Sequence, residues 1–247
     1  MKEEAPLLIV EWVNHHFGPS FASLLSIFGV HIPAGEEVIP MQMIMGAIVV
    51  IVLIVLSLVV RFSLSVEKPG KFQQSMELVV EFLETQLEEN VGHDGHKFLP
   101  IVGTLGIFIL LSNLLGLIPG LGSPTSNPNV PAGCAAVVFL YYNFAGIRKH
   151  GLGKYLKHFM GPVWWMAPLM IPIELISHLA RPLSLTVRLW GNIFAEELLI
   201  GIFFTIAAFL LPLPFVAFAI FGGFLQAFIF ITMSQMYLSM AVATEDH

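Results

Sequence analysis

Long uncharged stretches, separated by short polar segments, dominate the pattern of this chain. Four of them contain no Asp, Glu, Lys or Arg: residues 41–60, 98–120, 130–147 and 214–243. A helix rises 1.5 Å per residue, so about 20 apolar residues cross a hydrocarbon core about 30 Å thick. Hydrophobic residues make up 56% of the sequence and charged residues 11%, too few to cover a soluble domain of this length. The pattern predicts an all-α polytopic membrane protein.

Residues 72–87 show a different, amphipathic helical pattern. Apolar side chains recur at three- and four-residue spacing, at Phe72, Met76, Val79, Leu83 and Leu87. Four glutamates line the opposite side, and the Pro-Gly pair at 69–70 marks the start. Such a helix lies at the cytoplasmic membrane surface or against a partner, or it packs on its own protein as a solvated connecting helix. The spacing favours neither alternative.

The segment 162–211 is apolar but carries seven Glu, His, Arg and Asn side chains. They are Glu174, His178, Arg181, Arg188, Asn192, Glu196 and Glu197. A single helix from Pro172 to Leu211 is about 60 Å long, twice the hydrocarbon thickness, so it must be tilted or bent, with Pro182 as the expected kink. Two spans broken near Pro182 also fit the pattern and place the C-terminus outside. Pairing the segment with 214–243 as a tilted hairpin places the C-terminus inside.

Basic residues predict an orientation in the membrane. Four lie between the first and second uncharged stretches and four follow the third: Arg61, Lys68, Lys71, Lys97, Arg148, Lys149, Lys154 and Lys157. The segment 121–131 has no Lys or Arg. The positive-inside rule therefore places the N-terminus outside, 61–97 and 148–160 inside, and 121–131 outside.

Charge and cysteine content narrow the classes of function. The formal net charge of −6 argues against nucleic acid as a partner. Acidic residues near the N-terminus argue against a cleavable signal peptide. The only cysteine, Cys134, cannot form an internal disulfide. His93 and His96 lie in a Gly-containing loop with too few ligands for a metal site, so we expect a solvated loop, no metal and no cofactor.

The polar side chains of 162–211 gather on one helix face. At 100° per residue, six of the seven fall within roughly 80° of one another, and Glu197 points about 100° away from Glu196. An arginine at bilayer depth costs roughly 2.5–3.5 kcal/mol and cannot lose its charge. The nearest acids on the same face, Glu196 and Glu174, lie two turns or more from Arg188. We therefore expect Arg188 to face a mobile carboxylate of another protein; the alternative is an ion pair with an acid elsewhere in this chain.

Ionisable side chains on both sides of Arg188 predict a proton relay. Carboxylates and imidazole exchange protons near neutral pH once burial and water tune them. Glu174 and His178 lie toward the inner end of the segment, and Glu196 and Glu197 toward the outer end. Two aqueous half-paths separated by a fixed positive charge let protons enter and leave without leaking through. A transporter of anions and a structural anchor are alternatives, but the sequence has no second Arg-bearing segment in a matching half.

Residues 182–198, PLSLTVRLWGNIFAEEL, resemble the signature of F-type ATP synthase subunit a, whose core reads S-L-x-x-R-L-[FW]-G-N. Residues 225–241, LQAFIFITMSQMYLSMA, are similar to the last helix of that family, and NLLGLIP at 113–119 and PTSN at 124–127 also fit. The resemblance divides the chain into an N-terminal extracytoplasmic segment, 1–40, and a membrane domain, 41–247.

The resemblance implies roles for individual residues. Arg188 matches the essential stator arginine that faces the carboxylates of the c-ring. Polar positions that line the family's outer half-channel, or the interface beside the arginine, are matched by Asn192, Glu197 and Gln226. Positions near the inner half-channel are matched by Glu174 and Ser177. Ala219 stands where some members have an ionisable residue, so Glu196 is expected to supply that second group here. His178 is expected on the proton pathway only from its place on the polar face.

The resemblance also implies an architecture and a setting. We expect five membrane-inserted helices, an amphipathic surface helix and a long tilted C-terminal hairpin, with 162–211 as one helical unit. The expected partners are the c-ring, b-type peripheral stalk subunits, the rest of the ATP synthase and the lipid bilayer. The chain is expected to perform no covalent chemistry and to lie in a bacterial plasma membrane, with its N-terminus outside and its C-terminus cytoplasmic.

Overall fold

The fold is built from α-helices that follow the apolar stretches of the sequence. The computed structural model describes residues 8–27, 38–65, 69–92, 95–118, 121–158, 167–206 and 212–242, and no strand occurs in these ranges. The helices are α1 (Leu8–Ile27), α2 (Met41–Ser63), α3 (Lys71–Val91), η1 (Gly95–Phe98), α4 (Leu99–Leu115), η2 (Pro124–Ser126), α5 (Asn129–His150), α6 (Leu152–His158), α7 (Ala167–Ile206) and α8 (Leu213–Val242). In the described ranges, α2, η1–α4, α5, α7 and α8 are long and apolar enough to cross a membrane. The predicted fold class is therefore confirmed.

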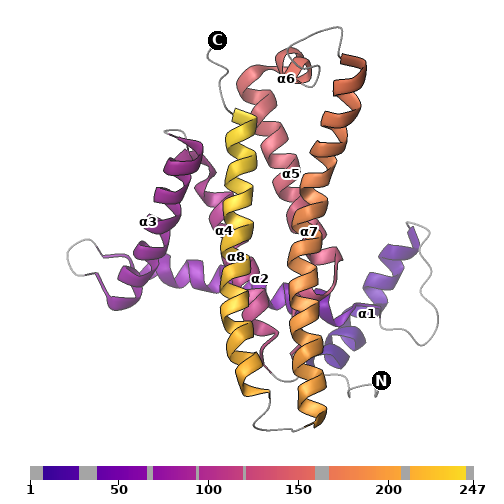
Figure 1. The fold of residues 1–247 in the computed structure, drawn as a ribbon. Coiled ribbons are helices and arrows are strands. Elements are labelled where there is room, and N and C mark those ends of the chain that lie inside the picture. The colour runs from indigo at the N-terminus through magenta and orange to yellow at the C-terminus, as the bar shows by residue number, and fades with distance from the viewer. Residues whose placement is uncertain are drawn as a thin grey trace.

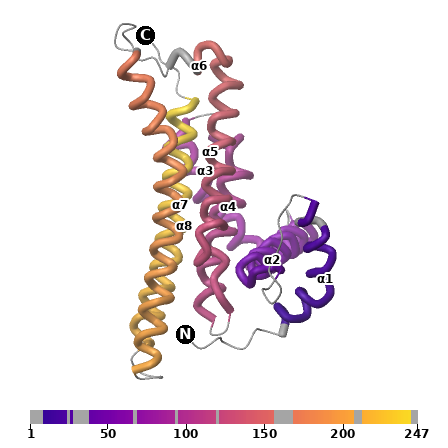
Figure 2. Tube along the Cα trace, turned by 90° about the vertical axis from the view of Figure 1, so that its right-hand side faces the viewer, coloured from indigo at the N-terminus to yellow at the C-terminus, as the bar shows by residue number. Residues whose placement is uncertain are grey.

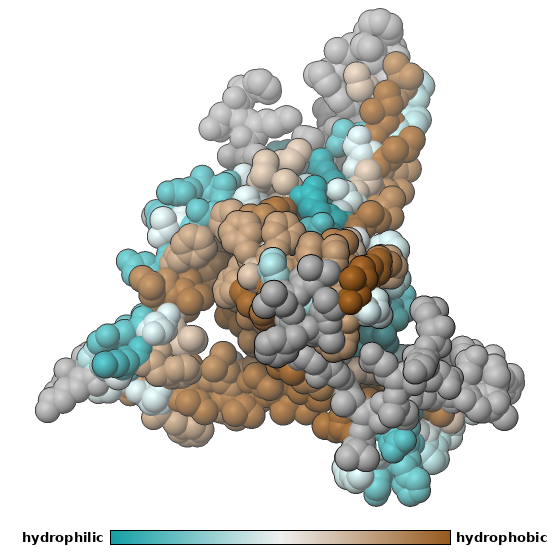
Figure 3. All heavy atoms as spheres, turned by 60° about the horizontal axis from the view of Figure 1, so that its bottom comes forward, coloured by the Kyte–Doolittle hydropathy of each residue, from teal (hydrophilic) through white to brown (hydrophobic). Residues whose placement is uncertain are grey.

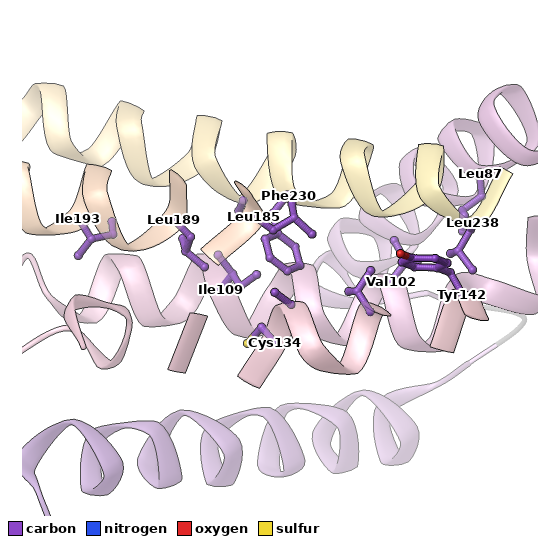
Figure 4. Close-up of a cluster of buried hydrophobic side chains, with 13 residues drawn as sticks. Leu87, Val102, Ile109, Cys134, Tyr142, Leu185, Leu189, Ile193, Phe230 and Leu238 are labelled. Carbon is purple, nitrogen blue, oxygen red and sulfur yellow. The ribbon is translucent and has the colours of Figure 1, made fainter. Parts of the chain in front are cut away.

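Helices α4, α5, α7 and α8 form the core of the molecule. Their apolar side chains interlock in one cluster, to which α3 adds Leu87 (Figure 4). Tyr142 and Phe230 are the largest side chains buried there, each no more than 2% exposed. Helix α4 approaches α8 closely at Gly106, where a Cβ atom would collide with the Ile231 side chain. This packing gives the polar residues of α7 and α8 defined neighbours.

Helix α7 is a single helix of 40 residues that contains Pro172 and Pro182. It begins at Ala167, five residues before Pro172, which the sequence pattern placed at its start, and it continues through Pro182 (Figure 1). The alternative of two spans broken near Pro182 is therefore wrong, and the single helical unit that the resemblance implied is confirmed. Each proline removes one backbone hydrogen bond, but packing against α5 and α8 holds the helix together. The predicted end at Leu211 lies outside the described residues.

Helix α2 runs across the long axis of α7 and α8 in two perpendicular views (Figures 1 and 2). Its 23 residues are about 35 Å long, which matches the hydrocarbon core, whereas the 40 residues of α7 reach about 60 Å. On α2, Ile51, Ile54 and Val55 are exposed apolar side chains. Apolar surface is extensive on this face of the molecule (Figure 3). When α2 stands upright in lipid, α7 and α8 therefore lie strongly tilted, as their length requires.

Helix α3 combines two of the environments that its pattern left open. In its C-terminal half, Leu83 and Leu87 are buried, and Asn90 Nδ2 donates a hydrogen bond of 2.8 Å to Gln235 Oε1 on α8. In its N-terminal half, Phe72 and Val79 of the same apolar face are 42% and 39% exposed. The helix thus packs on its own protein at one end and leaves apolar surface uncovered at the other.

The N-terminal segment contains a helix that the sequence pattern did not predict. Helix α1 packs on the start of α2, where Val10, Ile39, Ile44 and Met45 form a second buried cluster. Residues 1–7 and 28–37 lie outside the described residues.

Candidate functional site

The polar face of α7 lies along the boundary with α5 and α8. Because α7 continues through Pro182, the polar residues on either side of the proline keep the helical register. Arg188, Glu174 and Glu196 are half-buried, and His178 is buried. Beside them run side chains of α7 that belong to the core: Leu185, Leu189 and Ile193. The polar face is thus neither in the core nor fully exposed.

Arg188 lies near the middle of α7, between the acidic residues at its two ends. Of the ion pairs formed within the described ranges, none includes its guanidinium. The neighbouring side chains Leu183 and Val187 are 64% and 52% exposed, so an uncovered apolar surface lies next to the arginine. A guanidinium keeps its charge, so at bilayer depth it needs carbonyl groups, water or a carboxylate from outside.

Toward the C-terminal end of α7, polar side chains face α8. Asn192 Nδ2 donates a hydrogen bond of 2.9 Å to Oε1 of Gln226, which is 1% exposed. One turn further, the Glu196 carboxylate lies against Gly222, where a Cβ atom would collide with Oε1. Ala219 on α8 is also buried and brings no polar group. Helix α8 therefore accommodates the Glu196 carboxylate by lacking a side chain at Gly222.

Glu197 faces a different element, the turn that leads into η2. Its Oε1 accepts a hydrogen bond of 3.3 Å from the backbone N–H of Ser123. Ser123 packs closely on Gly116, where a Cβ atom would collide with the Cβ of Ser123. The loop between α4 and α5 therefore reaches α7 at this carboxylate.

A buried network of hydrogen bonds joins this loop to α4 and α8. The Ser123 hydroxyl donates to the carbonyl of Ser112 at 3.0 Å and lies 2.7 Å from the Thr125 hydroxyl. Thr125 Oγ1 donates to Asn113 Oδ1 at 2.8 Å, and Asn113 Nδ2 donates to the carbonyl of Gly223 at 3.3 Å. The network joins α4, η2 and α8, and all its side chains are buried.

Toward the N-terminal end of α7, charged and aromatic side chains meet. Arg181 forms an ion pair with Glu174 at 3.9 Å and lies over the ring of Tyr237 on α8, 5.6 Å from its centroid. The two charged residues are seven positions apart, so they are neighbours two turns apart on one face. Ser177 is exposed on the same stretch of helix.

His178 is held between α7 and α5. Its Nε2 lies 2.8 Å from Asn143 Oδ1 and 3.4 Å from the Tyr142 hydroxyl. Asn143 Oδ1 also accepts a hydrogen bond of 2.8 Å from the hydroxyl of Tyr155 on α6. Because an amide oxygen only accepts, His178 donates through Nε2. Burial raises the pKa of Tyr155, and the positive charge of Arg181 opposes part of that rise.

The structure sorts the predicted residues into two groups on either side of Arg188. We call the group toward the C-terminal end of α7, which was predicted to face outside, the outer group: Asn192, Glu196, Glu197 and Gln226. The group toward the N-terminal end of α7 is called the inner group: Glu174, Ser177 and His178. Sequence analysis missed the contacts of Ser123, Asn143 and Gly222, because each comes from another element and no single-helix pattern indicates it. In the described part of the chain, no three His, Cys, Asp or Glu side chains gather to hold a metal. His93 lies outside that part.

The chain is similar in sequence to a family of known proteins. Residues 42–239 match the family model described as ATP synthase A chain. The chain belongs to the ATP synthase A chain family. A protein of Solibacter usitatus (strain Ellin6076) named ATP synthase subunit a is 49% identical over 201 residues, which cover 81% of this chain and 86% of the relative. A protein of Trichlorobacter lovleyi with the same name is 49% identical over 190 residues, 77% of this chain and 82% of the relative.

The likeness to some family members extends beyond the part that the family model covers. A protein of Koribacter versatilis (strain Ellin345), also named ATP synthase subunit a, is 38% identical over 237 residues, 96% of this chain and 97% of the relative. Residues 42–247 number only 206, so this likeness includes residues before α2. The likeness to this relative therefore extends into the segment that forms α1.

Proposed function

We propose that this chain is the stator subunit of a proton-driven rotary motor, in which Arg188 faces the carboxylates of a rotating c-ring. One observation carries the proposal: the half-buried Arg188 has no acidic partner within the described residues and adjoins the uncovered apolar face of α7. A permanent cation at bilayer depth is costly unless an anion comes to it. A carboxylate presented by a neighbouring apolar protein meets that need.

The charge of Arg188 couples proton movement to rotation. A protonated carboxyl group is neutral and can turn through lipid, whereas beside the guanidinium the ionised carboxylate is favoured by Coulomb attraction. A ring carboxyl that reaches Arg188 therefore gives up its proton on one side, and it must regain one on the other side before it moves on. This chain makes and breaks no covalent bond other than those to exchanging protons.

The two polar groups, on α7 and at Gln226 of α8, supply the two half-channels of this proposal. The outer group, Asn192, Glu196, Glu197 and Gln226, delivers protons during ATP synthesis, and the inner group, Glu174, Ser177 and His178, takes them away. The Glu196 carboxylate at Gly222 and the Glu197 carboxylate at Ser123 lie at the outer end, as a proton-accepting entry requires. Arg188 separates the two groups and blocks a direct leak.

The proposal includes partners and an orientation. The uncovered apolar surface of α7 fits the c-ring, and the exposed apolar side chains of α3 fit b-type peripheral stalk subunits or lipid. We place α6 and the C-terminal end of α8 in the cytoplasm of a bacterial cell; both lie at one end of the bundle, opposite the C-terminal end of α7 (Figure 1). The basic residues at the end of α5 support this orientation.

Arg188→Ala in the assembled ATP synthase tests the proposal. ATP-driven acidification of membrane vesicles should fall to background while the complex still co-purifies with its ring, because the ring carboxylate loses its counter-charge. Arg148→Ala, which removes a cation at the end of α5, is the matched control and should pump like wild type. Undiminished, inhibitor-sensitive pumping in Arg188→Ala would overturn the proposal.

A further inference from the structure

The Asn14 side chain of α1 clamps that helix to Ile39, which lies two residues before α2 begins. The Ile39 N–H donates a hydrogen bond of 2.9 Å to Asn14 Oδ1, and Asn14 Nδ2 donates one of 3.1 Å to the Ile39 carbonyl. The amide thus satisfies both backbone groups of Ile39 in a partly buried place, as a neighbouring strand would. Val10 and Met45 close an apolar cluster around this clamp.

The start of α2 rests in turn on the loop before η2. Met41 Cε lies 3.4 Å from the position of a Cβ on Gly122, and Pro124 Cβ lies 3.9 Å from the position of a Cβ on Gly46. Leu121 of the same loop packs against the apolar cluster of α1 and α2. The loop is therefore held between α1 and α2 on one side and α4 and α7 on the other.

This loop carries the backbone N–H that meets Glu197. The hydrogen bond from Ser123 to Glu197 Oε1 is 3.3 Å long, so a small displacement of the loop breaks it. On the side of α4 the loop lies close to Gly116, since a Cβ on Gly116 would be 3.1 Å from the Ser123 Cα atom. On the other side it rests on α1 and α2, which Asn14 holds together.

We propose that Asn14 is a positioning residue for Glu197: by clamping α1 to Ile39 it holds the Ser123 N–H on the Glu197 carboxylate. The clamp fixes which way this carboxylate points and keeps it ready to exchange protons. The inference rests on the proposed function, in which Glu197 belongs to the outer half-channel. In this proposal, α1 helps to position a carboxylate that exchanges protons, although the family model does not cover this helix.

Thiol labelling of the loop in the assembled complex tests the clamp without relying on the role of Glu197. The reporter is Asn127→Cys, a half-buried site of the same loop, in a Cys134→Ser background. Asn14→Leu keeps the size of the side chain and loses both hydrogen bonds to Ile39. It should raise the labelling rate about 3- to 10-fold, because one or two hydrogen bonds no longer oppose opening of the loop. Ser20→Ala, on the exposed side of α1, should leave the rate unchanged. An unchanged rate in Asn14→Leu would overturn the proposal.

The pH profile of ATP-driven proton pumping tests whether Asn14 acts on Glu197. Asn14→Leu should shift the pH midpoint of pumping, because the environment of the Glu197 carboxylate changes. A lower rate with an unmoved midpoint would make Asn14 a structural residue only and overturn the proposal. If Asn14→Leu does not assemble, Asn14→Asp keeps the acceptor for the Ile39 N–H and should give intermediate labelling and an intermediate shift. An unaltered profile in Glu197→Gln would instead refute the proposed role of Glu197, whatever the labelling shows.

Discussion

The inner and outer groups of polar side chains lie on either side of Arg188 and are held by different kinds of neighbour. The inner group meets other side chains: Glu174 pairs with Arg181, and His178 bonds Asn143 on α5. The outer carboxylates meet a loop and empty space, since Glu197 binds the backbone N–H of Ser123 and the side chain of Ser126, and Glu196 fills the gap at Gly222. Among the ion pairs of the described residues, only the inner carboxylate has a cation beside it. The comparison indicates that the outer acids are the more available for proton exchange.

The largest effect should come from removing both outer carboxylates. We expect Glu196→Ala combined with Glu197→Ala to reduce ATP-driven acidification of vesicles to background, because the outer half-channel then has no proton-accepting group. The inner Glu174→Gln is the comparison variant and should retain more activity, since Arg181 already compensates its charge. Wild-type pumping in the double variant would end the idea that these acids form the entry.

A smaller effect is expected from filling the gap that holds Glu196. In Gly222→Ala the new Cβ collides with the carboxylate, so Glu196 must turn away and pumping should fall several-fold. Gly133→Ala adds the same methyl group to α5 in open space and should have no effect. Shortening the acid with Glu196→Asp in the Gly222→Ala background should restore part of the activity. Equal rates for Gly222→Ala and the control would contradict the proposed fit.

The smallest effect on pumping should come from replacing Asn143, which binds His178 of the inner group. Asn143→Leu leaves the Tyr155 and His178 donors without their shared acceptor, which costs about 1–3 kcal/mol of stability. The thermal unfolding midpoint of the detergent-solubilised complex should fall, while pumping at moderate temperature should change less than in Gly222→Ala. Asn129→Leu, at the exposed start of α5, is the control. Pumping lost at unchanged stability would mean that the Asn143 bonds carry protons, and the contrast between the groups would disappear.

The helices of the membrane domain could be predicted from the sequence because lipid offers the backbone no hydrogen-bond partners. A run of apolar residues must satisfy its own backbone in the bilayer, so the uncharged stretches became helices close to their predicted limits, as α5 and α8 illustrate. The state of Pro182 could not be predicted in this way. Whether a proline breaks a helix depends on how the neighbouring helices pack, and here α7 continues.

The candidate site was predictable in part for the same reason. Residues on one face of one helix are related by a fixed rotation, so the order Glu174, Arg188, Glu196 along α7 follows from spacing alone. The partners of these residues come from separate elements. Neither the Asn143 bond to His178 nor the Ser123 bond to Glu197 follows from any periodicity, because loops and helix crossings set both.

The chain alone thus determined that this is a polytopic helical protein with an arginine and acids on one long helix, because apolar length and helical spacing are local properties. Only the tertiary structure decided that Arg188 lacks an acidic partner among the described residues, that Gly222 makes room for Glu196, and that α1 supports the loop at Glu197. These contacts join residues far apart in sequence. Their distances depend on how the helices cross, which the packing of many side chains sets together.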